Sequence, residues 1–173
     1  MNRLQRGDLP ALREVYDRHH EHVRAFARRL VGDSGVAEDL VQETFLELGR
    51  ALRNFRGEAS LRTFLVSIAA NRARNHVRAA ARLRAVHARS AEDRAPPSTP
   101  EQLHDRREMA ATLKLALDEL PLEQRVAVVL CEVEERTSAE VAAMLGVPDA
   151  TVRTRVFHGK RKLREALARR GLK

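Results

Sequence analysis

Aromatic residues are scarce in this sequence of 173 residues: they make up 3% of it, and tryptophan is absent. A base-stacking platform, an aromatic cage or an aromatic-rich sandwich core needs many rings, so none of these is expected. Alternation of β-branched and aromatic residues, which is typical of strands, is also hard to find, whereas Ala, Leu, Arg and Glu dominate. The sequence therefore predicts an all-α fold.

Cysteine is nearly absent as well, and long apolar runs are missing. The single cysteine, Cys131, excludes an internal disulfide and a cysteine-based zinc cluster, and it fits a reducing compartment. No apolar run approaches the length of a membrane span, and Arg3, Arg6 and Asp8 interrupt the N-terminal segment, which does not resemble a signal peptide. We therefore expect a cytoplasmic protein.

Catalytic motifs are missing too. No Gly-rich phosphate loop, nucleophile elbow or paired acid and base stands out, so we expect no enzymatic activity, no cofactor and no small-molecule substrate. His19, His20 and His22 suggest a metal site, but Glu21 is the only nearby carboxylate, and positions 19 and 22 alone make a poor site. Histidines in or beside the apolar stripe of a core helix are the simpler interpretation, and no metal is expected.

Positive charge, in contrast, is in excess. The chain has 32 basic and 24 acidic residues, which gives a net charge of +8, and its pI is about 10.8. Twenty-eight of the basic residues are arginines, which reflects either bidentate phosphate recognition or a GC-rich genome. Between Arg50 and Arg84, nine arginines accompany one acidic residue, Glu58. A solvated face normally mixes both signs, so this segment favours a polyanionic partner.

A proline-rich segment, AEDRAPPSTPE, divides the chain. Its prolines remove backbone donors and favour an extended conformation, so residues 85–105 are predicted to be a linker between a module at 1–84 and a module at 106–173. Apolar periodicity predicts the helices on either side. Their expected ranges are 9–30, 34–54 and 61–83 in the first module, and 106–120, 122–134, 138–145 and 148–167 in the second.

Helix-capping signals support these boundaries. Asp33 or Ser34 is expected to cap the second helix, and Pro121 suits the first turn of the helix at 122–134. Thr137 and Glu140, three residues apart, form the pattern of a capping box.

The end of the second module has the pattern of a helix-turn-helix. A short helix, a turn through Gly146 and a longer helix with a basic outer face are typical of this motif, whose second helix enters the major groove. We expect a buried seam of Val152, Val156, Leu163 and Leu167. The residues expected on the outer face are Arg153, Thr154, Arg155, Phe157, His158 and Lys160. A solvated basic face on an ordinary C-terminal helix is the alternative.

These segments resemble a known family. AEDLVQETFLELGRALRNFRGEASLRTFLVSIAANRARNHVR resembles region 2 of bacterial extracytoplasmic function (ECF) sigma factors, a branch of the sigma-70 family. LPLEQRVAVVL and SAEVAAMLGVPDATVRTRVFHGKRKLREAL resemble region 4 of the same proteins. The resemblance covers nearly the whole chain and keeps the order of the two regions. It implies two small helical modules joined by a flexible linker: region 2 as a bundle of three to four helices and region 4 as a helix-turn-helix.

The resemblance also implies roles for matching residues. Those implied to bind the beta-prime clamp helices of core RNA polymerase are Glu38, Asp39, Leu40, Gln42, Glu43 and Leu46. Those implied to bind the minus-10 promoter element are Asn54, Phe55, Arg56, Gly57, Ser60, Arg62, Asn71, Arg74 and Arg78. Those implied to bind the minus-35 element lie on the outer face of the last helix and are Arg153, Thr154, Arg155, Phe157, His158 and Lys160.

The function implied by the resemblance is promoter recognition and transcription initiation by an RNA polymerase sigma factor. Its partners would be core RNA polymerase, including the beta subunit, promoter DNA and an anti-sigma factor, which in many relatives lies at the membrane. A plain helix-turn-helix regulator that never enters polymerase is the main alternative, and an RNA-binding adaptor is a third interpretation. The regulator would leave the FRGEAS loop and the acidic face of the second helix, which would repel DNA, without a purpose, and binding to structured RNA would distinguish the adaptor.

Overall fold

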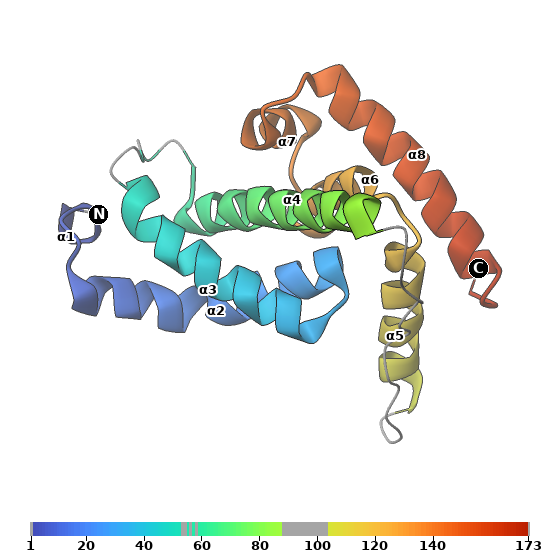
Figure 1. Ribbon diagram of the computed structural model, residues 1–173, viewed down its shortest axis with the longest axis horizontal. Coiled ribbons are helices and arrows are strands. Elements are labelled where there is room, and N and C mark those ends of the chain that lie inside the picture. Colours follow the sequence, from blue (N-terminus) through green and yellow to red (C-terminus); the bar gives the residue numbers. More distant parts are fainter. Residues whose placement is uncertain (1, 53–54, 56, 58, 88–103, 173) are drawn as a thin grey trace. The chain divides into compact units, whose positions relative to one another are not determined.

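The computed structural model describes residues 2–52, 55, 57, 59–87 and 104–172. Every regular element in this described part is a helix, which confirms the predicted all-α class (Figure 1). The chain divides into two compact units, Met1–Ala73 and Arg74–Lys173. Most of the predicted linker, residues 88–103, lies outside the described residues. None of the described helices combines the length and hydrophobicity that crossing a membrane requires.

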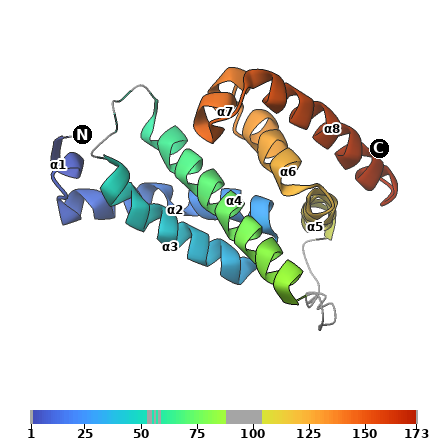
Figure 2. The ribbon, with the colours of Figure 1, turned by 45° about the horizontal axis from the view of Figure 1, so that its top comes forward.

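The first unit is built on a helical hairpin. After the short α1 (Asn2–Gln5), α2 (Leu9–Val31) and α3 (Ser34–Ala51) lie side by side and run in opposite directions (Figures 1 and 2). Gly32 ends α2 with a φ of 71°, a conformation that favours glycine. Asp33 then begins α3, since its side chain accepts a hydrogen bond from the Val36 N–H at 2.9 Å. The predicted cap at Asp33 is therefore confirmed.

The core of this unit comes from the apolar stripe of each helix. Phe26 and Leu30 of α2 and Leu48 of α3 have no exposed surface. The third contribution comes from α4 (Leu61–His87), whose Leu65 and Val66 are equally buried. Because these side chains close one face of each helix, the charged residues are left on the outer faces.

Among its described residues, the second unit contains four further α-helices and one π-helix. Its elements are α5 (His104–Asp118), α6 (Leu122–Val128), the π-helix η2 (Val129–Val133), α7 (Ser138–Leu145) and α8 (Asp149–Ala168). Both residues of the predicted capping box are in place, since the Thr137 side chain accepts from the Glu140 N–H and the Glu140 carboxylate accepts from the Thr137 N–H. Gly146, with a φ of 63°, ends α7, and α8 packs along α6 and α7 (Figure 2).

A buried arginine fixes the junction of α5 and α6. Arg125 is 9% exposed, and its guanidinium donates to the Asp118 carboxylate at 2.8 Å and to the Asp118 carbonyl at 2.7 Å. Burial lowers the pKa of Arg125, and the Asp118 carboxylate opposes this effect by stabilising the charge. Pro121 lies between these partners as the N-cap of α6, one position earlier than the first-turn position predicted for it.

Two features of the second unit differ from the sequence expectation. The helix predicted at 122–134 changes from α to π geometry at Val129, which inserts an extra residue into one turn. The fully buried residues of α8 are Val152, Gly159 and Ala166, whereas Val156, Leu163 and Leu167 of the predicted seam are half-buried. The reason is steric: small residues at positions 159 and 166 allow α8 to approach closely, and the larger ones flank the contact.

Gly159 makes the tightest of these contacts. A Cβ atom at this position would lie 2.6 Å from Cγ2 of Val128 and 3.3 Å from the carbonyl oxygen of Gln124. A backbone oxygen cannot move away as the end of a flexible side chain can. Gly159 is therefore required by the packing of α8 on α6.

We expect Gly159→Ala to lower the free energy of unfolding of the second unit by about 1–3 kcal/mol, because overpacking outweighs the gain in helix propensity. Gly49→Ala is the matched control: Gly49 lies inside α3, is exposed, and has no atom within 4 Å of a Cβ built there. That control is expected to stabilise its helix by about 0.5–1 kcal/mol. Urea denaturation of the full chain measures both, and equal effects of the two substitutions would contradict the steric argument.

Candidate nucleic-acid and protein interfaces

The middle of α3 presents the residues expected to bind core polymerase. Asp39, Gln42 and Glu43 are exposed, and Leu46 is 76% exposed. Leu40, in contrast, is 1% exposed and packs in the core of the unit. A side chain without exposed surface cannot contact a partner in this conformation, so Leu40 supports the surface from beneath.

Ion pairs within the unit engage part of the predicted acidic face. Glu38 is held by Arg24 at 2.8 Å and by Arg28 at 3.4 Å, both from α2. Arg72 of α4 lies 2.6 Å from Glu47 and 4.0 Å from Glu43. Glu38 therefore joins α2 to α3. The carboxylates that stay open to a partner are Asp39 and, in part, Glu43.

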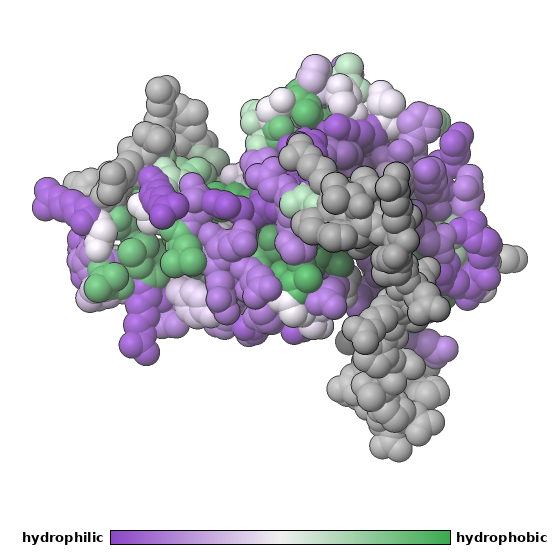
Figure 3. Space-filling model, in the orientation of Figure 1, coloured by the Kyte–Doolittle hydropathy of each residue, from purple (hydrophilic) through white to green (hydrophobic). Residues whose placement is uncertain are grey.

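An apolar groove that the sequence pattern did not predict lies beside this acidic face. Tyr16 of α2 and Phe45 of α3 contact each other edge to face, with ring centroids 4.8 Å apart. Leu9, Tyr16 and Leu46 are exposed around them, and Gln42 lines the same groove. Apolar surface is visible on this unit among hydrophilic side chains (Figure 3). The signal in the sequence was Leu46, an apolar residue on the polar face of its helix.

The loop expected to recognise the minus-10 element is described in part. Asn54 and Arg56 lie outside the described residues. Phe55 packs on Phe64 of α4, with ring centroids 4.6 Å apart, and Gly57 has a φ of 76°, which favours glycine. Ser60 is exposed and accepts a hydrogen bond from the Thr63 N–H at 3.1 Å, so it also caps the start of α4.

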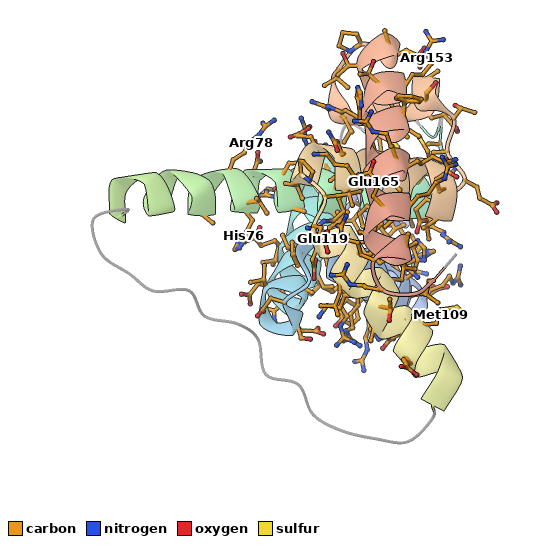
Figure 4. All side chains as sticks on the ribbon, turned by 90° about the vertical axis from the view of Figure 1, so that its right-hand side faces the viewer. His76, Arg78, Met109, Glu119, Arg153 and Glu165 are labelled. Atoms are coloured by element: carbon orange, nitrogen blue, oxygen red, sulfur yellow. The ribbon has the colours of Figure 1, made fainter. Side chains whose placement is uncertain are left out.

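The remaining minus-10 candidates lie along α4. Arg62 is exposed and donates to Nε2 of His22 on α2 at 3.0 Å. Asn71 is half-buried, and Arg74, where the second unit begins, is 7% exposed. Arg78 is exposed, on the side of α4 opposite to His76 (Figure 4). Arg62 and Arg78 are thus the two of these candidates whose side chains are exposed in the structure.

The outer face of α8 carries the minus-35 candidates, and three of them are freely accessible. Arg153 and Thr154 are exposed, and Phe157 is 65% exposed with its ring against that of His158. Arg153 is near one end of α8 (Figure 4), within the first two turns that enter the major groove in a helix-turn-helix. Its side chain pairs with Asp149 at 3.0 Å.

The other three are half-buried. Arg155 turns toward α6, where Glu123 lies 3.0 Å away, and its side chain is 21% exposed. Lys160 pairs with Glu132 of η2 at 2.9 Å. His158 lies between Arg155 and Lys160 along α8. Arg155 therefore points only partly outward, contrary to the expectation, because its guanidinium pairs with the Glu123 carboxylate.

Family models match both units. "Sigma-70 region 2" matches residues 15–83, and "Sigma-70, region 4" matches residues 110–163. The two matches follow the order of the regions predicted from the sequence. Together they cover more than half of the chain.

Curated relatives carry corresponding names. The "ECF RNA polymerase sigma factor SigE" of Mycolicibacterium smegmatis is 37% identical over 93% of this chain, and this chain spans 63% of that protein's length. The "ECF RNA polymerase sigma-E factor" of Escherichia coli is 32% identical, and the alignment covers 92% of this chain and 88% of that protein.

A solved structure has a similar fold. It is a sigma factor, RpoE, in complex with the anti-sigma factor NepR from Bartonella quintana, with a TM-score of 0.72 and 23% sequence identity. The match covers 92% of this chain and 98% of that one. On the family models and the relatives together, this chain belongs to the sigma-70 family of RNA polymerase sigma factors, in its extracytoplasmic function branch.

Proposed function

We propose that this chain docks on core RNA polymerase through the exposed face of α3 and the neighbouring apolar groove, and reads the minus-35 element with α8. The observation that carries the proposal is the contrast between two exposed surfaces. One surface presents Gln42, Asp39 and Leu46, which suit a protein partner, and the other presents Arg153 and Phe157, which suit DNA. Co-purification of the full chain with core polymerase tests it most directly.

The helix-turn-helix regulator remains the competing interpretation. Such a regulator would bind a palindromic DNA site as a dimer and would not bind core polymerase. A chain that binds duplex DNA tightly by itself, and does not associate with core polymerase, would favour this interpretation. We further propose that an anti-sigma factor restrains the chain, in the cytoplasm or at the membrane. What supports such a partner is that RpoE, a sigma factor of similar fold, forms a complex with an anti-sigma factor.

The exposed face of α3 and its groove can be tested by substitution. We expect Leu46→Ala and Gln42→Ala each to weaken binding to core polymerase by about 1–2 kcal/mol, because the first removes apolar contact area and the second removes a polar anchor. Titration of core polymerase against a labelled chain measures the loss. Glu14→Ala is the control, since Glu14 is an exposed residue of α2 that does not line the groove. Unchanged affinity of both variants would contradict the assignment.

Substitutions on α8 test the contact with the minus-35 element. We expect Arg153→Ala to weaken promoter binding by about 1–3 kcal/mol and to relax the preference at one base pair, as the loss of a bidentate guanine contact does. Arg155→Ala should change the preference less and the stability of the second unit more, because Arg155 pairs with Glu123. Selection of minus-35 sequences by each holoenzyme from a randomised library separates the two effects. If Arg155→Ala alters the selected base and Arg153→Ala does not, the roles are reversed.

Ser60 is expected to contact the minus-10 element and also caps α4. Ser60→Ala should lower the free energy of unfolding by about 1 kcal/mol, and Ser60→Asp should restore it, because aspartate also caps helices well. If the loop touches DNA, the carboxylate of Ser60→Asp should nevertheless weaken open-complex formation through repulsion of phosphate. Normal promoter melting by the stable Ser60→Asp variant would make Ser60 a cap only.

A further inference from the structure

A basic groove lies between η2 and α8 on the second unit. Its cationic side chains are Arg136, Arg153, Lys160, Arg161 and Arg164, and within the described lining Glu132 is the one carboxylate. Arg153 and Lys160 are two of the residues proposed to contact the minus-35 element. A phosphate that reaches Lys160 therefore also approaches Glu132, whose charge has the wrong sign for DNA.

Glu132 is engaged with one of these cations. Its Oε2 atom lies 2.9 Å from Nζ of Lys160, although the two residues are 28 positions apart in the sequence. The side chains of Lys160 and Glu132 are 37% and 44% exposed. An exposed ion pair of this kind is weak, so a phosphate group can reach the ammonium group and replace the carboxylate.

The other carboxylates paired with groove cations do not line the groove. Arg153 pairs with Asp149, Arg161 with Glu165 and Arg136 with Glu140, each four residues away in the sequence. Glu132 differs because it comes from a separate element and lies inside the groove. Its position depends on the π-helix, which lies between α6 and the capping box of α7.

The thiol of Cys131, next to Glu132 in the sequence, adds no charge to the groove. Burial, followed by the charge of Glu132, raises the pKa of Cys131, so this side chain stays protonated at neutral pH. The electrostatic balance of the groove is therefore set by five cations and one anion among its described side chains.

We propose that Glu132 competes with DNA phosphate for Lys160 and so lowers the affinity of the chain for DNA of arbitrary sequence. Non-specific binding depends on phosphate contacts alone, so the loss of one contact weakens it directly. A cognate site also offers base contacts to Arg153 and Phe157, and these are not reduced by the pair. This inference rests on the proposed role of α8 in DNA recognition.

The test is a titration of a random-sequence DNA duplex with the full chain at several salt concentrations, followed by fluorescence anisotropy. We expect Glu132→Gln to bind about two- to fivefold more tightly than the unsubstituted chain, because the amide no longer holds the ammonium group. The slope of log affinity against log salt should become steeper by up to about 0.9, the value for one added phosphate contact. Lys160→Ala should bind more weakly with a shallower slope.

Glu119→Gln is the matched control for the loss of one negative charge. Glu119 belongs to the same unit, has a similar exposure of 38%, and pairs with Arg169 and Arg170 at the far end of α8 from Arg153 (Figure 4). Its substitution should increase the affinity less than Glu132→Gln does. In a chain that also carries Lys160→Ala, the advantage of Glu132→Gln over Glu119→Gln should vanish.

The outcomes separate the inference from the function on which it rests. If Lys160→Ala weakens binding while Glu132→Gln behaves like Glu119→Gln, the competition is refuted and the DNA surface stands. An advantage of Glu132→Gln that persists without Lys160 likewise refutes the competition. If Lys160→Ala binds like the unsubstituted chain, the outer face of α8 is not the DNA surface, and both the inference and the proposed function of α8 fail.

Discussion

The close approach of α8 to α6 at Gly159 is the constraint on which the basic groove of the second unit depends. Because a hydrogen stands where any other residue has a Cβ, the backbone of α8 can lie against Val128 and Gln124. Val128 directly precedes the π-helix, and Lys160 directly follows Gly159. The same contact therefore fixes the distance between η2 and the basic face of α8. The packing of Gly159 on α6 thus also determines how the charged side chains of η2 and α8 are placed relative to one another.

Ion pairing within each unit has a different consequence in the two units. In the first, Arg24 and Arg28 hold Glu38, and Arg72 holds Glu47, so the charges join helices and leave an apolar groove as the distinctive surface. In the second, the paired cations are themselves the candidate DNA contacts. Protein docking can then proceed without breaking ion pairs, whereas DNA binding by α8 must exchange carboxylates for phosphates.

Much of this architecture was predictable from local signals. The helix boundaries followed from apolar periodicity and caps, and the capping box at Thr137 and the cap at Asp33 are confirmed, because capping depends on residues three positions apart. The π-helix and the role of Gly159 were not predictable, since both depend on contacts between helices distant in sequence. For the same reason the pattern could not reveal that Arg155 turns to Glu123, a residue 32 positions earlier.

The pairing on α8 bears on how a small cationic protein avoids binding all DNA equally. With a net charge of +8, non-specific attraction to phosphate is strong at low salt. Asp149, in the first turn of α8, pairs with Arg153 and interacts favourably with the helix dipole, and its negative charge repels phosphate without destabilising the helix. Phe157 has no ion pair to lose, and its contact with a base is as favourable with these carboxylates present as without them. A carboxylate that pairs with a phosphate-binding cation, as Glu132 does with Lys160, thus weakens the sequence-independent attraction, so base contacts such as that of Phe157 supply a larger share of the total binding free energy.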